Sequence, residues 1–193
     1  MKVMKFGGTS VGKPQRMKEV ANLVTASAEP VMVVLSALSG TTNALVEISN
    51  LLGTGNRVAA KEKITALSNH YKQFVDELLL QQAAKQKANA VLAEHFEFLH
   101  IILKISFSEA LNKDILAQGE LLSTKLFSVY LDEQQIAHQL IPALEFMTLD
   151  KQDEPQVGAI KVKLTQLLNE HPGNKIFITQ GYICRNARGE VDN

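Results

Sequence analysis

The first 35 residues alternate between the sequence patterns of a strand, a helix and a second strand. Residues 3–6 form a short β-prone run. Residues 15–28 then place apolar side chains at helical spacing, at Met17, Val20, Ala21, Val24 and Ala28. Residues 31–35 (Val-Met-Val-Val-Leu) are continuously apolar, which is typical of a strand covered on both faces. This strand, helix, strand order predicts an α/β fold with a mainly parallel sheet and a right-handed crossover.

A glycine-rich turn lies between the first strand and the helix. Lys5 stands near the end of the strand, and Gly7, Gly8, Thr9 and Ser10 follow it. Glycine lets the backbone approach a ligand closely, and successive free N–H groups before a helix form an anion site. The lysine adds a positive charge, and the two hydroxyls can donate to a ligand oxygen or cap the helix. The turn predicts a phosphate or carboxylate site, with a simple helix-capping turn as the alternative.

Residues 7–13 also match the Gly-x-x-x-x-Gly-Lys core of a P-loop. A P-loop continues with a serine or threonine, whose hydroxyl binds magnesium. Here the next residue is Pro14, which has no hydroxyl and which suits the first turn of a helix. The P-loop interpretation is therefore rejected.

A second hydroxyl-rich loop, residues 36–43 (Ser-Ala-Leu-Ser-Gly-Thr-Thr-Asn), follows the second strand. Ligands of open α/β sheets bind outside the carboxyl ends of the strands. Two such loops on consecutive strands indicate one shared site. Capping of the predicted helix at residues 44–52 is the alternative role of this loop.

The middle of the chain, residues 57–133, is almost entirely helical in pattern. Residues 58–80 and 82–103 have the spacing of a helical pair, and residues 107–133 form a further helical stretch. Three histidines in this region have no metal-site spacing and are expected at the surface or the edge of the core: His70, His95 and His100.

The last of these helical stretches is predicted to break at Gln118, Gly119 and Glu120. Glycine in a helix interior is unfavourable by roughly 1 kcal/mol, so Gly119 indicates a kink or a close backbone approach. Glu120 is either a ligand for a cationic group or a solvent-exposed glutamate at a helix start.

The last third of the chain returns to the α/β pattern. Residues 136–141 are predicted to form a strand, and residues 156–170 an amphipathic helix. A buried strand is expected within residues 175–184, with Gly181 near its exit. Residues 186–189 have the composition of a hairpin turn whose second strand the chain does not complete.

Composition limits the class of protein. The chain has 193 residues and 46% hydrophobic content, enough for one packed domain, with or without a helical insertion. A formal net charge of zero disfavours nucleic acid as a partner, and the apolar runs are too short to span a membrane. Cys184 is the only cysteine, which excludes an intrachain disulfide, and no signal-peptide pattern precedes the first strand. These features predict a cytoplasmic protein.

Four segments resemble one family. Lys-Phe-Gly-Gly-Thr-Ser-Val at residues 5–11 resembles the N-terminal signature of aspartokinases, which belong to the amino acid kinase family. Residues 35–43, 118–124 and 179–183 resemble three further segments of these enzymes, in the same order. The resemblance implies a three-layer αβα sandwich with a mainly parallel sheet and a helical insertion at about residues 57–133.

The resemblance also implies a reaction. Aspartokinases transfer the γ-phosphoryl group of ATP to the β-carboxylate of L-aspartate, with Mg²⁺, in the first step of lysine, threonine and methionine biosynthesis. Lys5 would stabilise charge on the transferring group as the catalytic residue. The residues that would hold the phosphoryl oxygens are Gly7, Gly8, Thr9 and Ser10. The residues that would bind aspartate are Ser36, Thr42 and Glu120, with the glutamate receiving the α-ammonium group. No residue is assigned as a metal ligand.

The chain departs from the family pattern at its end. Aspartokinases continue with an arginine and a Gly-Gly-Ser-Asp segment, then the ATP-binding part and regulatory ACT domains. This sequence stops at Asn193, before that segment. We therefore expect residues 1–193 to be the N-terminal, aspartate-binding portion of a catalytic domain, a poor kinase alone, and part of a homo-oligomer when full-length. The alternatives are another amino acid kinase, acting on glutamate, carbamate or a nucleoside monophosphate, and a non-catalytic ligand-binding or dimerisation module.

Overall fold

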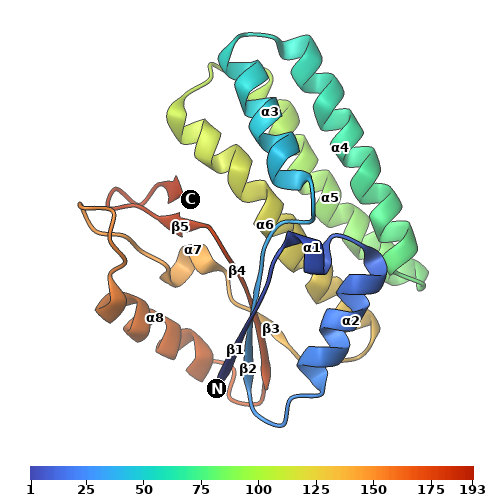
Figure 1. The fold of residues 1–193 in the computed structure, drawn as a ribbon, viewed down its shortest axis with the longest axis vertical. Helices are drawn as coiled ribbons and strands as arrows, with labels where there is room; N and C mark the ends of the chain where they lie inside the picture. Colours follow the sequence, from blue (N-terminus) through green and yellow to red (C-terminus); the bar gives the residue numbers. More distant parts are fainter.

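A sheet of four parallel strands is the centre of the computed structural model, which describes residues 1–193 (Figure 1). In spatial order the strands are β1 (Lys2–Phe6), β2 (Val31–Leu35), β4 (Ile176–Gln180) and β3 (Gln139–Leu140). Phe6 lies opposite Leu35, and Leu35 lies opposite Gln180, so three strands end level with one another. The predicted parallel sheet is confirmed.

The alternation of side chains along β2 separates two hydrophobic clusters. Val31, Val33 and Leu35 join a large cluster with helix α2 (Pro14–Thr25) and the helices that follow β2. Met32 joins a smaller cluster on the other face, together with helix α7 (Ala143–Phe146) and helix α8 (Val157–Asn169). The sheet is therefore covered on both faces, which explains why β2 is apolar throughout.

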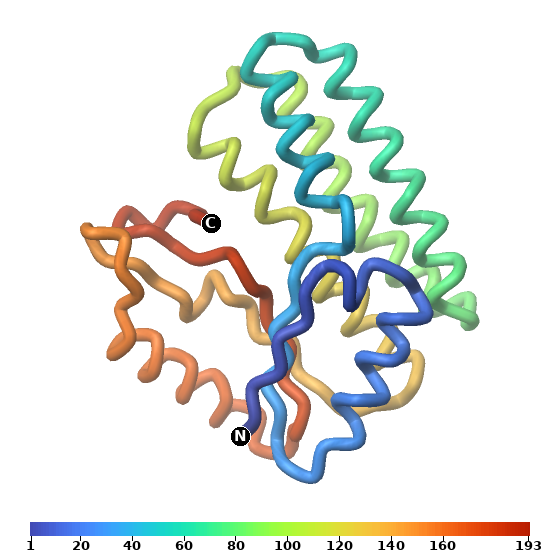
Figure 2. The backbone as a smooth tube through the Cα atoms, in the orientation of Figure 1, coloured from blue at the N-terminus to red at the C-terminus, as the bar shows by residue number.

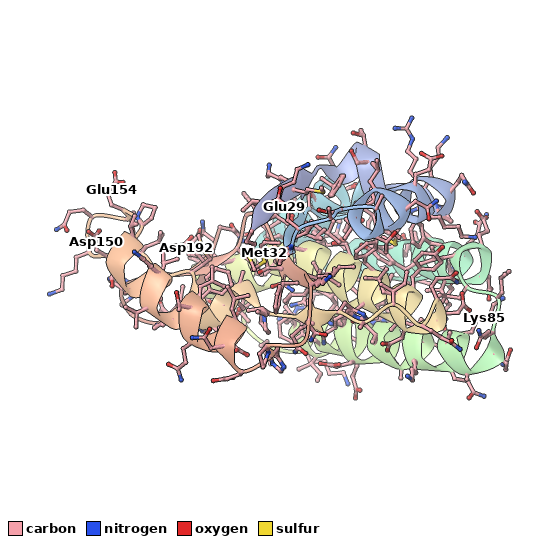
Figure 3. All side chains as sticks on the ribbon, turned by 90° about the horizontal axis from the view of Figure 1, so that it is seen from below. Glu29, Met32, Lys85, Asp150, Glu154 and Asp192 are labelled. Carbon is pink, nitrogen blue, oxygen red and sulfur yellow. The ribbon has the colours of Figure 1, made fainter.

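Four helices form a bundle beyond the carboxyl ends of the strands, and the last of them also packs against the sheet (Figures 1 and 2). They are α3 (Thr41–Gly53), α4 (Arg57–Leu78), α5 (Gln82–Ile102) and α6 (Glu109–Glu133). The predicted helical pair is confirmed as α4 and α5. Viewed from below, Lys85 of α5 and Asp150 near α8 mark opposite ends of the molecule (Figure 3). None of these helices is both long and apolar enough to cross a membrane.

The predicted break in α6 is wrong. The helix is continuous through Gly119. A Cβ at this position would lie 2.7 Å from the Cβ of Ala37, so the missing side chain permits a close approach between α6 and the loop after β2. The position of His95 is also corrected, because this side chain is only 5% exposed and its Nδ1 lies 2.5 Å from Oε1 of Gln118.

Other predicted boundaries shift. The strand expected at residues 136–141 is limited to β3, because the N–H of Ile136 still donates to the carbonyl of Leu131 at the end of α6. The expected turn at residues 186–189 is confirmed, with Gly189 at φ +79°. It joins β5 (Cys184–Arg185) to β6 (Val191–Asp192), so the strand pair is completed within the chain.

Candidate active site

The exits of three neighbouring strands meet at one edge of the sheet. The N–H of Ser36, after β2, donates to the carbonyl of Phe6 over 3.1 Å. The N–H of Gly181, after β4, donates to the carbonyl of Leu35 over 2.9 Å. These hydrogen bonds tie each exit to the neighbouring strand. The prediction that the first two loops lie together is confirmed.

The first loop is more regular than its glycines suggest. Residues Gly8–Val11 form a single helical turn, α1, and the N–H of Ser10 donates to the carbonyl of Gly7 over 2.9 Å. A Cβ at Gly8 would lie 2.9 Å from the carbonyl oxygen of Ala37, so only glycine fits there without displacing the second loop. Gly7 is exposed, and no atom lies within 4 Å of the position that a Cβ would occupy. A ligand can therefore approach the backbone of Gly7 closely.

Lys5 is exposed at the carboxyl end of β1, opposite Val34 in the register. Its Cε lies 4.0 Å from the position that a Cβ on Gly181 would occupy, so the lysine stem passes beside the exit of β4. Lys5 forms no salt bridge. Its ammonium group is therefore free to bind an anion at this edge.

Tyr182, which follows Gly181 after β4, has φ +66°, an uncommon backbone conformation for a residue with a bulky side chain.

Glu120 reaches the second loop from the middle of α6. Its side chain is 3% exposed, and its Oε1 accepts a hydrogen bond from the N–H of Ala37 over 3.2 Å. Burial raises the pKa of this carboxyl, and the hydrogen bond from Ala37 partly opposes that shift. No lysine, arginine or histidine forms a salt bridge with Glu120. A buried carboxylate without a cation is unfavourable, and a ligand ammonium group would compensate it.

A hydrogen-bonded network holds this part of α6 against the sheet. The hydroxyl of Ser123 donates to the carbonyl of Ser36 over 2.7 Å. The hydroxyl of Thr124 donates to the carbonyl of Glu120 over 2.8 Å, and it accepts from Nε2 of Gln180 over 2.7 Å. Sequence patterns do not predict these positioning contacts, although the residues lie within the segments at 35–43, 118–124 and 179–183.

Tyr71 of α4 supports the start of α3. Its hydroxyl lies 3.0 Å from Oγ1 of Thr41, and both side chains are buried. Burial raises the pKa of Tyr71, so the phenol stays neutral. Nothing in the sequence distinguishes this tyrosine from an ordinary core aromatic residue. Thr42, the predicted ligand-binding neighbour of Thr41, is half-buried, and no hydrogen bond joins it to Glu120.

The predicted site residues thus fall into two groups. One group lines the exit of β1: Lys5, Gly7, Gly8, Thr9 and Ser10. The other surrounds the exit of β2, where Ala37 and Ser123 link Ser36 to Glu120. The contact between Gly8 and Ala37 brings the two groups together. The arrangement can hold an anionic group near Lys5 and a cationic group near Glu120.

Comparison with known proteins gives consistent results. The sequence pattern of the amino acid kinase family matches residues 1–193. Lysine-sensitive aspartokinase 3 of Escherichia coli (strain K12) is 31% identical over 192 residues, covering 98% of this chain and 42% of that protein. The chloroplastic aspartokinase 2 of Arabidopsis thaliana is 41% identical over 138 residues, covering 68% of this chain and 24% of that protein.

A solved aspartokinase structure is also similar to this chain. The crystal structure of E. coli aspartokinase III in complex with aspartate and ADP aligns with a TM-score of 0.81 and 28% identity. The alignment covers 100% of this chain and 43% of that chain. The chain therefore spans less than half the length of each of these relatives.

Proposed function

The chain belongs to the amino acid kinase family, and we propose that it is the aspartate-binding portion of an aspartokinase. The proposed reaction transfers the γ-phosphoryl group of ATP to the β-carboxylate of L-aspartate and yields 4-phospho-L-aspartate. The similarity to proteins that carry the name aspartokinase supports the proposal.

The substrate proposal rests on the buried carboxylate of Glu120, which has no cationic partner within the protein. An amino acid brings an ammonium group, and a charge-assisted hydrogen bond to this carboxylate would offset the unfavourable burial of its charge. Glu120 would therefore orient the substrate by its α-ammonium. Ser36 lies in the loop after β2 and Thr42 in the first turn of α3, and their hydroxyls are proposed to contact the rest of the amino acid.

Phosphoryl transfer needs positive charge and hydrogen-bond donors where negative charge develops. We assign this role to Lys5 and to the turn that contains Gly7, Gly8, Thr9 and Ser10. The lysine has no competing carboxylate, and the turn offers backbone N–H groups and two hydroxyls. ATP enters this proposal as a substrate.

Magnesium accompanies ATP in kinases. No group of three or more histidine, cysteine, aspartate or glutamate side chains is placed to hold a metal ion. We therefore assign none of its residues to Mg²⁺ and derive no step through the ion.

Binding of L-aspartate to the 193-residue chain tests the substrate assignment by isothermal titration calorimetry. We expect L-aspartate to bind and Glu120→Gln to weaken binding about tenfold or more, because a hydrogen bond between charged groups is lost. Succinate, which lacks the ammonium group, is the matched control ligand and should be insensitive to Glu120→Gln. Equal affinity of the variant for L-aspartate would remove Glu120 from the site. Tighter binding of L-glutamate would favour another amino acid kinase.

Turnover is tested by hydroxylamine trapping of the acyl phosphate in the presence of ATP and Mg²⁺. We expect the 193-residue chain alone to give little or no product, and turnover like that of a complete enzyme would contradict this. In a full-length protein, Lys5→Ala should lower kcat more than it raises the KM for aspartate. A full-length protein that binds aspartate but forms no acyl phosphate would favour a non-catalytic module.

A further inference from the structure

A cavity of about 370 Å³ lies beside the first loop. Its lining residues are Thr9, Gly12, Lys13, Arg16 and Ser39. They come from α1, from the α1–α2 connection, from the first turn of α2 and from the loop after β2. None of these side chains is apolar and none is acidic. Neither Lys5 nor Glu120 lines this cavity, so it is distinct from the proposed catalytic and ammonium positions.

The spacing of its walls is set by a close approach at Gly12. A Cβ at Gly12 would lie 2.5 Å from the Cβ of Ser39 and 2.7 Å from the carbonyl oxygen of Gly8. Only glycine allows the α1–α2 connection and the second loop to touch in this way. The Cβ of Ser39 is therefore held close to the connection that carries Lys13. A site whose walls are already in place loses less entropy when a ligand binds.

The charges at this cavity are not neutralised within the protein. Lys13 and Arg16 take part in none of the six salt bridges of the chain. The guanidinium of arginine presents a planar fork that matches phosphate oxygens, and a lysine ammonium adds a point charge. The hydroxyls of Thr9 and Ser39 can donate further hydrogen bonds. Two cations and two hydroxyls without an acidic neighbour are the composition of an oxyanion site.

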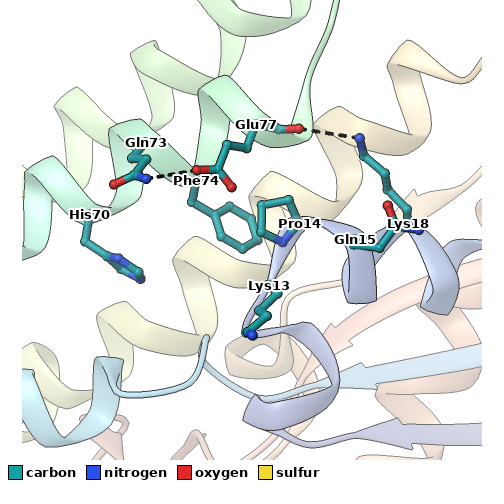
Figure 4. Close-up of a pocket in the computed structure, with 9 residues that line it drawn as sticks. Lys13, Pro14, Gln15, Lys18, His70, Gln73, Phe74 and Glu77 are labelled. Carbon is teal, nitrogen blue, oxygen red and sulfur yellow. Dashed lines mark hydrogen bonds between the residues drawn. The ribbon is translucent and has the colours of Figure 1, made fainter.

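A larger neighbouring cavity, of about 560 Å³, shares Gly12 and Lys13 with the first and reaches α4 (Figure 4). Here the walls carry both signs of charge. Glu77 accepts a hydrogen bond from Nε2 of Gln73 over 2.9 Å, and Lys18 donates to the backbone carbonyl of Glu77 over 3.4 Å. The carboxylate of Glu77 disfavours an anion in the larger cavity. Of these two cavities, the smaller one is therefore better suited to an anion.

We propose that Thr9, Lys13, Arg16 and Ser39 form a second anion site, which binds a small oxyanion of the phosphate class. This proposal does not depend on the proposed reaction, because Lys13 and Arg16 are assigned neither to phosphoryl transfer nor to aspartate binding. Thr9 belongs to the first loop, so an anion bound here would contact the turn that follows Lys5.

Titration of the ¹⁵N-labelled 193-residue chain with inorganic phosphate, at ionic strength held constant with chloride, tests this site. We expect saturable chemical-shift changes at the amides of Thr9, Gly12, Arg16 and Ser39. Arg16→Gln should weaken binding about tenfold, since a charged hydrogen bond is lost, and Arg16→Lys should weaken it less. Lys161→Ala, at an exposed cation on α8, is the matched control and should leave binding unchanged.

Lys5→Ala separates this site from the proposed phosphoryl position. We expect phosphate still to bind at the Arg16 cavity of this variant. If Lys5→Ala abolishes binding while Arg16→Gln does not, the ion occupies the first loop and the proposal is wrong. Shifts that do not saturate and that spread over all exposed lysines would also overturn it. Both Lys13 and Arg16 are exposed, so Lys13→Gln provides a second variant if Arg16→Gln loses the dispersed spectrum of the folded chain.

Discussion

The carboxylate of Glu120 accepts a hydrogen bond from the backbone N–H of Ala37 over 3.2 Å, across 83 residues of sequence. This contact ties the middle of α6 to the loop after β2. Gly119 makes it possible, because a side chain at that position would collide with Ala37. The proposed ammonium site is thus built by one helix and one loop that pack without an intervening side chain.

Glu120→Gln should stabilise the ligand-free chain at neutral pH. Burial raises the pKa of the Glu120 carboxyl in the folded state, so its contribution to stability is complete below the ordinary glutamate pKa. That contribution is lost as the pH rises through the raised pKa. Glutamine keeps an acceptor for Ala37 and carries no charge. We expect a gain on the order of 1 kcal/mol at about pH 7, equivalent to about 2–4 °C in Tm.

Thermal unfolding followed by circular dichroism checks this prediction at about pH 7 and at about pH 4, where the gain should shrink. A variant that is less stable than the wild type at neutral pH would contradict it.

Gly119→Ala should destabilise the chain by about 1–3 kcal/mol, because the new methyl group would overlap the side chain of Ala37. It should also weaken aspartate binding by displacing the second loop. Gly158→Ala in α8 is the matched control, since a Cβ there has nothing within 4 Å. Gly158→Ala should raise the free energy of unfolding by up to about 1 kcal/mol, because alanine has a higher helix propensity than glycine. Urea unfolding measures both variants, and equal effects would refute the packing role of Gly119.

Tyr71→Phe should remove the hydrogen bond to Thr41 and leave the buried hydroxyl of Thr41 without a partner. The expected loss of unfolding free energy is about 1–3 kcal/mol. Because Thr41 precedes Thr42 in α3, we also expect weaker aspartate binding by calorimetry. Tyr130→Phe provides the comparison, since Tyr130 is 8% exposed and its hydroxyl has no hydrogen-bond partner in the protein. If the two variants behave alike, Tyr71 has only a packing role.

His95 should make the chain sensitive to mild acid. Burial lowers the pKa of His95, and the hydrogen bond with Gln118 opposes this shift only in part. A lowered folded-state pKa means that stability is complete above the ordinary histidine pKa and is lost as the pH falls. We expect the Tm to decrease below about pH 6.5, and His95→Leu to flatten that dependence. His70→Leu, at an exposed site, should keep the wild-type slope, and an unchanged slope in His95→Leu would exclude this histidine as the cause.

Local sequence patterns were sufficient for the sheet and for the edge at which the site lies. The apolar run at residues 31–35 predicted a strand covered on both faces, and the structure places a hydrophobic cluster on each side of it. The glycine and hydroxyl residues after β1 and β2 predicted two adjacent loops. These predictions succeed because strand periodicity and turn chemistry act between residues that are close in sequence.

Contacts between segments that are distant in sequence become visible only in the folded structure. The low helical propensity of Gly119 predicted a break, but α6 is continuous there and Gly119 packs against Ala37. The burial of Glu120 beside Ala37, and the hydrogen bond from Tyr71 to Thr41, have no signature in periodicity or spacing. Local sequence patterns indicate which segments form strands and loops at the site. Which side chains become neighbours there depends on how helices far along the chain pack, because hydrophobic burial specifies a face of a helix and not its partner.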